Sequence, residues 1–132
     1  MLVAMKYAAV VAGLSVIGAA AVAQDTGVKR TILQKADVAV GVPHESLMGQ
    51  AELGPGASIG RHSHPGVEMG YVLEGEFDVM VGNESPRRVK AGDSYLIPAG
   101  TIHDAKSVGA TPGKVLAAWV VEKGKPLSTP AK

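Results

Sequence analysis

Glycine and proline interrupt the chain so often that little room is left for long helices. The 132 residues include 17 Gly and 8 Pro, and such a density without a collagen-like period is typical of many short strands joined by tight turns. The segments between these turns are rich in β-branched and aromatic residues, and no apolar stripe of helical period exceeds three turns after residue 23. We expect strands over 46–53, 70–73, 77–81, 95–97 and 115–121. The sequence therefore predicts an all-β fold, either a sandwich or a barrel.

The first 23 residues differ in character from the rest. A short segment with one cation, Lys6, precedes an uncharged run over 7–22 that ends in Ala21-Val22-Ala23. This is the pattern of a secretory signal peptide, so residues 1–23 predict a periplasmic or secreted mature protein. The alternative is an uncleaved membrane anchor, but the run is shorter than the roughly 20 residues that a span needs. We expect cleavage near Gln24 and no membrane association afterwards.

Charge and cysteine content exclude several kinds of partner and site. The formal net charge is +1, which gives no electrostatic basis for binding nucleic acid phosphates. The chain has no cysteine, so disulfides, thiolate metal sites and thiol nucleophiles are excluded. Any metal ion must therefore be bound by histidine and carboxylate side chains.

Three of the four histidines fall in two windows framed by glycines. The first window contains His62 and His64, and Glu68 follows four residues later. Residues two apart on a strand point to the same side of a sheet, so both imidazoles can face one point. The turn at Pro65-Gly66 can bring Glu68 back on the next strand. The second window contains His103, shortly after Pro98 and Gly100.

These windows resemble the two signature motifs of the cupin family. The first motif is matched by Gly56, His62, His64, Glu68 and Gly75, and the second by Gly92, Pro98, Gly100 and His103. One position departs from the pattern, because Ser107 stands where the second motif usually ends in Asn. The resemblance covers about 45–121 and implies a small antiparallel jelly-roll β-barrel with a metal ion in its mouth. We therefore expect an N-terminal arm or strand at 24–44, the barrel at 45–122 and a polar tail, extended or frayed, at 123–132.

The two motifs also indicate which residues would bind the metal ion, namely His62, His64, Glu68 and His103. Three imidazoles and a carboxylate suit one divalent transition ion, which could be Fe, Mn, Ni, Cu, Co or Zn. Four protein ligands would leave two positions open on a six-coordinate ion, where O2 and a substrate can be held together. The alternative is that His62 and His64 are ordinary exposed histidines and Glu68 a surface acid.

Two functions remain open for such a chain. The first is a metal-dependent enzyme acting on a small organic molecule, with an oxygenase favoured over an isomerase or lyase. The second is a non-catalytic periplasmic module that binds a metal or a small ligand. An enzyme needs a general base near its substrate, and the candidates are Glu68, Glu52, Tyr95 and His44. We favour Glu68 as the catalytic residue, because a carboxylate can shift on the ion and accept a proton while the imidazoles hold the ion in place.

The remaining expectations concern packing and assembly. Phe77, Val79 and Val81 share one face and are predicted to be core, while Tyr95 and Trp119 are either core residues or a substrate wall. Both faces of 46–53 carry polar or small residues, so the pattern does not choose which one points inward. Asp104 is a candidate partner of the ligand histidines. Small barrels expose strand edges, so we expect a homodimer in which 28–40 adds a strand across the interface.

Overall fold

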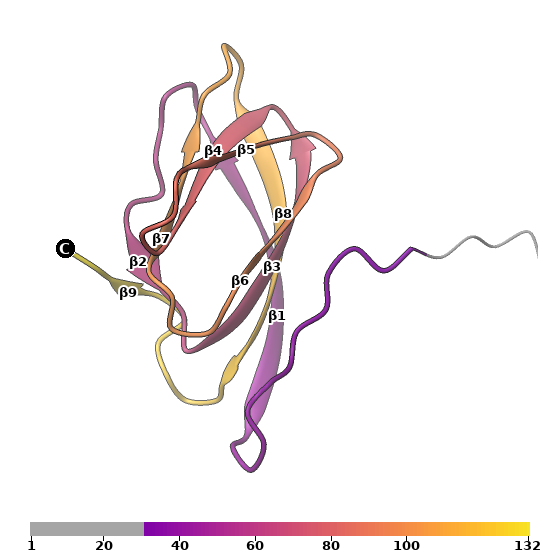
Figure 1. Ribbon diagram of the computed structural model, residues 1–132, viewed down its shortest axis with the longest axis vertical. Coiled ribbons are helices and arrows are strands. Elements are labelled where there is room, and N and C mark those ends of the chain that lie inside the picture. The colour runs from indigo at the N-terminus through magenta and orange to yellow at the C-terminus, as the bar shows by residue number, and fades with distance from the viewer. Residues whose placement is uncertain (1–30) are drawn as a thin grey trace, which may run out of the picture. The chain divides into compact units, whose positions relative to one another are not determined.

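Two antiparallel sheets face each other in the computed structural model (Figure 1). The structure describes residues 31–132, so the proposed signal peptide at 1–23 and the start of the arm lie outside the described residues. Within that part, the first sheet has the order β1 (His44–Leu53), β8 (Gly113–Glu122), β3 (Gly66–Glu74) and β6 (Ser94–Ile97). The second has the order β5 (Arg87–Lys90), β4 (Glu76–Val81), β7 (His103–Ser107), β2 (His62–Ser63) and β9 (Thr129–Pro130). The all-β prediction is confirmed.

The glycines that frame the two motifs are turn residues. Gly56, Gly75, Gly92 and Gly100 have φ values of 77°, 78°, 94° and 71°. Side chains other than glycine rarely adopt this left-handed region, because their Cβ atom clashes with the backbone. The glycines of the two motifs therefore mark the positions at which the chain turns from one strand to the next.

The core lies between the two sheets and contains the residues predicted from strand alternation. Phe77 and Val79 are buried, and Val81 packs against the same cluster. The alternation in β1 is resolved as well, because Ala51 and Leu53 face the core while Met48 is 72% exposed. The inward face of β1 is therefore the one that contains the small and aliphatic residues.

Both ends of the described chain contact the sheets. Residues 31–43 form no strand within this single chain, and the strand expected within 28–40 across a dimer interface stays a prediction. Residues 31–43 run along the outside of the first sheet (Figure 1), where the Gln34 amide donates to the Ser94 hydroxyl at 2.8 Å. In the tail, which we expected to be extended or frayed, β9 pairs with β2. No helix within 31–132 is long and apolar enough to cross a membrane.

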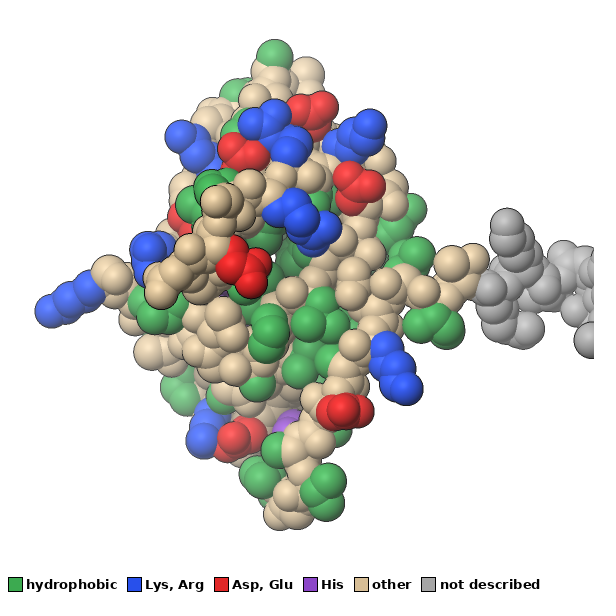
Figure 2. All heavy atoms as spheres, viewed as in Figure 1, with side chains coloured by type: hydrophobic (Ala, Val, Ile, Leu, Met, Phe, Trp, Pro, Cys, Tyr) green, Lys and Arg blue, Asp and Glu red, His purple; other side chains and the backbone are tan. Residues whose placement is uncertain are grey.

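Acidic and basic side chains are mixed on the face drawn in Figure 2. Arg88 forms ion pairs with Asp78 and Glu76 on neighbouring strands of the second sheet. Exposed pairs of this kind contribute little to the free energy of folding. Their effect is to leave this face without a broad patch of one sign of charge.

Candidate metal centre

The four proposed metal ligands come from both sheets and meet between them. His62 on β2 lies directly opposite His103 on β7 in the strand register. His64 follows β2 in the connection to β3, and Glu68 lies on β3 in the other sheet. The β2 pairing therefore orients His62 toward His103, and the turn at Pro65-Gly66 returns the chain so that Glu68 faces both.

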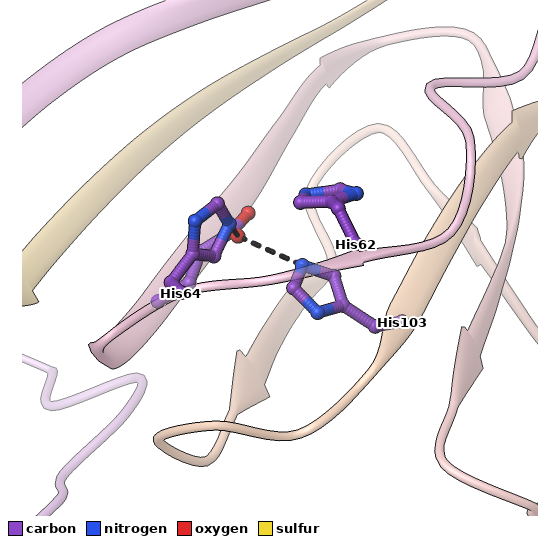
Figure 3. Close-up of side chains that lie close together, drawn as sticks. His62, His64 and His103 are labelled. Atoms are coloured by element: carbon purple, nitrogen blue, oxygen red, sulfur yellow. Dashed lines mark hydrogen bonds and ion pairs between the residues drawn. The ribbon is translucent and has the colours of Figure 1, made fainter. Parts of the chain in front are cut away.

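The ligand atoms of these residues are close and buried. One nitrogen of each imidazole and one oxygen of Glu68 all lie within 4.8 Å of one another. Oε2 of Glu68 is 2.8 Å from Nε2 of His64 and 3.2 Å from Nε2 of His103. The four residues are only 5% to 9% exposed. Figure 3 shows the three imidazoles converging on one point between the strands.

Backbone carbonyls fix the orientation of each imidazole. The Nδ1–H of His62 donates to the Gly60 carbonyl at 2.6 Å, and that of His103 to the Thr101 carbonyl at 2.9 Å. The Nδ1–H of His64 donates to the Leu127 carbonyl at 2.6 Å. Because a carbonyl can only accept, Nδ1 carries the proton and Nε2 faces the centre in all three rings. This is the tautomer that a metal-binding imidazole needs, and such a bond to Nδ1 is the usual support of a metal ligand.

The charge balance of the site also fits a cation. Burial alone would raise the pKa of the Glu68 carboxyl, but hydrogen bonds from His103, His64 and Tyr95 hold that pKa well below its usual range. Burial alone would lower the pKa of His64. Its hydrogen bonds to Glu68 and Leu127, together with the charge of Glu68, outweigh the effect of burial, so the pKa of His64 is raised. The site thus favours a positive charge between carboxylate and imidazoles. A divalent ion can supply that charge in place of the protons.

Two aromatic residues that sequence reasoning left as core or wall have defined polar roles here. The Tyr95 hydroxyl donates to Oε1 of Glu68 at 2.9 Å. Burial and the charge of Glu68 raise the pKa of Tyr95, so Tyr95 is a donor to the carboxylate and not a base at neutral pH. The Trp119 Nε1–H lies 3.3 Å from Nε2 of His64. Tyr95 and Trp119 therefore contact the ligands as well as filling space.

Asp104 supports His62 indirectly, through the backbone of Gly60. Its Oδ1 accepts from the Gly60 N–H at 2.9 Å, and its Oδ2 accepts from the Ser58 hydroxyl at 2.6 Å. The carbonyl of Gly60 is the acceptor for His62. Asp104 therefore holds the backbone that orients His62 without contacting the imidazole itself.

A cavity of about 270 Å³ adjoins the four ligands. Its other walls are largely apolar, and they include Phe77 and Val79 from one sheet and Val115 and Trp119 from the other. Leu127 and Ser128 from the C-terminal tail complete the lining. A small molecule in this cavity would lie beside a bound metal ion.

Several other candidates from the sequence lie outside the cavity. Of the four proposed general bases, only Glu68 and Tyr95 line it, whereas Glu52 and His44 do not. Glu52 is exposed on the outer face of β1, and its carboxylate is 3.8 Å from the Lys114 ammonium. The Nδ1 of His44 bonds to the Val42 carbonyl at 2.7 Å, away from the centre. The carbonyl of Leu127 had no signal in the sequence, because any residue can supply a backbone carbonyl.

Several known proteins share sequence or fold with this chain. The cupin domain model matches residues 49–119. The chain is 32% identical over 77 residues to germin-like protein 5-1 of Oryza sativa subsp. japonica, which covers 54% of this chain and 35% of that protein. An oxalate oxidase structure in complex with the substrate analogue glycolate has a TM-score of 0.57 and 26% identity, and covers 64% of this chain and 45% of the other. The DMSP lyase DddQ from Ruegeria pomeroyi shares the fold with a TM-score of 0.59 and 22% identity, over 65% of this chain and 43% of the other.

The chain thus spans about a third of the germin-like protein and less than half of either solved structure. The match to the domain model nevertheless extends over more than half of this chain and includes all four candidate ligands. The resemblance carried by the two histidine motifs is confirmed, and this chain belongs to the cupin family.

Proposed function

We propose that this protein is an exported, metal-dependent enzyme of the oxygenase type that acts on a small organic molecule. The observation that carries the proposal is the position of His62, His64, Glu68 and His103, which form part of the wall of a cavity of about 270 Å³. Buried metal ligands beside a cavity are typical of a site that binds a substrate, whereas a structural site encloses its ion on all sides.

The cavity walls favour a substrate with an apolar body and one oxygen donor. Most of the walls are aliphatic or aromatic, among them Ala51, Leu53, Phe77, Val79, Ala105 and Val115. No Lys or Arg of the described chain lines the cavity. A dianion such as oxalate would therefore place a second carboxylate against apolar walls with no cationic side chain beside it, which is unfavourable. Enols and aromatic diols with small apolar substituents fit this environment better.

The residues of the chain have separate roles in this proposal. Three imidazoles would hold the ion, because their Nε2 atoms face the centre. A bound iron or manganese ion would supply Lewis acidity and one-electron chemistry at this point. Glu68 would offer its carboxylate to the ion, and that carboxylate would accept a proton from the hydroxyl of a substrate once the ion replaces its hydrogen bonds to His64 and His103. Tyr95 keeps the carboxylate in place through Oε1.

The proposal is tested by metal analysis of the purified protein, followed by O2 consumption with a panel of enols, aromatic diols and oxalate. We expect bound iron or manganese, and consumption with the apolar diols or enols that exceeds consumption with oxalate. Glu68→Gln should lower turnover by about 10²- to 10⁴-fold while metal is retained, whereas Glu52→Gln, on the outer face, should not. Unchanged turnover in Glu68→Gln would exclude Glu68 as the base.

A non-catalytic module that binds a metal or a small ligand is the second candidate. The observation that favours it is the small number of proton acceptors at the cavity. Tyr95 is a donor to Glu68, and Asp104 is occupied by Gly60 and Ser58. Among the described residues that line the cavity, Glu68 is then the one carboxylate left as a candidate base, and it would also be a ligand of the ion. Metal binding without O2 consumption or substrate loss across the whole panel would support this second function.

A further inference from the structure

The C-terminal tail passes beside the candidate metal centre and contacts it. After β8 the chain turns at Lys123-Gly124, where Gly124 has a φ of 84°. It then returns along β2, which Figure 1 shows as the C-terminal end lying next to that strand. We name residues 126–131 the C-terminal strap.

The strap is bonded at two points, to β2 and to Arg61 just before it. Thr129 and Pro130 pair with Ser63 and His62 as the short antiparallel ladder between β9 and β2. The Ala131 N–H then donates to the Arg61 carbonyl at 2.9 Å. The strap is therefore held in a fixed register beside the strand that contains His62.

That register brings the Leu127 carbonyl to His64. The Nδ1–H of His64 donates to it at 2.6 Å, across 63 positions of the sequence. The matching carbonyls for His62 and His103 come from Gly60 and Thr101, each two residues before its histidine. Among the three, His64 is thus the one whose Nδ1–H is bonded to a carbonyl from a distant part of the described chain. Leu127 and Ser128 also line the cavity.

We propose that the C-terminal strap is a positioning element of the metal centre, which fixes the tautomer and orientation of His64 through the Leu127 carbonyl. This rests on the proposed metal site, but not on the proposed reaction. Bonds of this kind to a ligand histidine usually change metal affinity by about 10- to 100-fold. The strap should therefore control how tightly this site holds its ion.

The first test compares two truncations of the full chain. A chain that ends at Lys125 lacks the strap, and a chain that ends at Ala131 lacks only Lys132. The probe is Mn²⁺, with the free ion measured by electron paramagnetic resonance during titration. We expect the chain ending at Lys125 to bind Mn²⁺ about 10- to 100-fold more weakly than wild type, and the chain ending at Ala131 to bind as wild type does. Equal affinity in all three would overturn the proposal.

A second measurement does not require a metal ion. In the metal-free protein the hydrogen-bonded Nδ1–H of His64 should give a protected imidazole signal in ¹H–¹⁵N spectra, assigned by its loss in His64→Gln. Removal of the strap should abolish that signal while the corresponding signals of His62 and His103 persist. If the His64 signal survives without the strap, the proposal is wrong. If wild type binds no Mn²⁺ but the signal depends on the strap, the strap orients His64 as argued, and it is the proposed metal site that is wrong.

Two further variants separate the carbonyl from general packing. Leu127→Ala keeps the carbonyl and removes only the side chain, so its Mn²⁺ affinity measures how much of the loss on truncation comes from packing. A semisynthetic protein with an ester in place of the Leu127–Ser128 amide weakens the same carbonyl as an acceptor, and should lower the affinity. The matched control has the ester at the Ala131–Lys132 bond. The positioning role would be contradicted if Leu127→Ala lost as much Mn²⁺ affinity as the truncated chain does. It would also be contradicted if the Leu127 ester bound Mn²⁺ as tightly as wild type. The ester variant gives this answer even if the truncated chain does not fold.

Discussion

At the scale of single residues, a histidine bonded to a backbone carbonyl is not by itself a metal ligand in this chain. His44 makes such a bond to Val42, two residues earlier, as His62 does to Gly60. The difference is that the Nε2 atom of His62 meets two other imidazoles and a carboxylate. Convergence of these groups, which follows from the pairing of β2 with β7, creates the site.

The pKa shifts of His64 and Glu68 predict how the metal-free protein responds to pH. The folded pKa of Glu68 is lowered, so its contribution to stability is present above its unfolded value of about 4.3 and is lost as the pH falls. The folded pKa of His64 is raised, so its contribution is present below its unfolded value of about 6.5 and is lost as the pH rises through the folded value. Both contributions coexist between these two unfolded values.

The corresponding measurement is thermal unfolding with and without Mn²⁺ from pH 4 to 8. Because Mn²⁺ needs an unprotonated Nε2, the increase in Tm on adding the ion should grow as the pH rises past the pKa of His64. The His64→Gln variant should lose most of this pH dependence. An increase in Tm that is the same at pH 5 and at pH 8 would be inconsistent with His64 as a ligand.

At the scale of elements, the sequence predicted the strands with several apolar residues in alternation and missed those that are short or mostly polar. The expected segments 46–53, 70–73, 77–81, 95–97 and 115–121 all lie within observed strands. β2 and β9 have two residues each and β5 is mostly exposed, so they have no apolar alternation to detect. β7 is buried but polar, because its residues serve the site.

The residues of the candidate site were easier to predict from the sequence than these short or polar strands. The spacing of His62 and His64 requires only that both lie on one face, and the glycine turns bring Glu68 and His103 to them. The contacts of Tyr95 and Trp119 depend on how two strands cross, and the contact of Leu127 depends on the path of the tail. None of these three follows from local spacing.

Close approach of β3 and β6 leads to a prediction about Gly70. Gly70 lies opposite Tyr95 in the strand register, and a Cβ atom at position 70 would overlap the Tyr95 ring. Gly70→Ala should therefore lower the free energy of unfolding by about 1–3 kcal/mol and weaken Mn²⁺ binding, because Tyr95 is displaced from Glu68. Gly54→Ala is the matched control, since its added Cβ meets no atom within 4 Å. Chemical denaturation and metal titration check both variants, and a Gly70→Ala protein as stable as Gly54→Ala would refute the argument.

At the scale of the whole molecule, the candidate site is assembled from residues far apart in the chain. The ligands begin at His62, and the carbonyl that orients His64 belongs to Leu127. The candidate site therefore includes contacts from the last described residues as well as from the two motifs. Mutations in the tail should affect the site even though no motif lies there.

The proposal of export makes a prediction about the other end of the chain. The uncharged run over 7–22 and Ala21-Val22-Ala23 should direct secretion and cleavage. Intact-mass measurement of protein from a secreting host should give a chain that begins near Gln24. A variant with Ala21→Asp and Ala23→Asp should keep its full length, because the small residues at the cleavage site are lost. Full-length wild-type protein in the membrane fraction would instead support an anchor.

The most direct test of the account is the metal content of three proteins purified in parallel. Wild type and His44→Ala should each contain about one divalent transition ion per chain, because His44 lies outside the centre. The double variant His62→Ala/His64→Ala should contain almost none, and its thermal unfolding would establish that it is folded. The same metal content in the double variant as in wild type would contradict the central claim that these histidines form a metal centre.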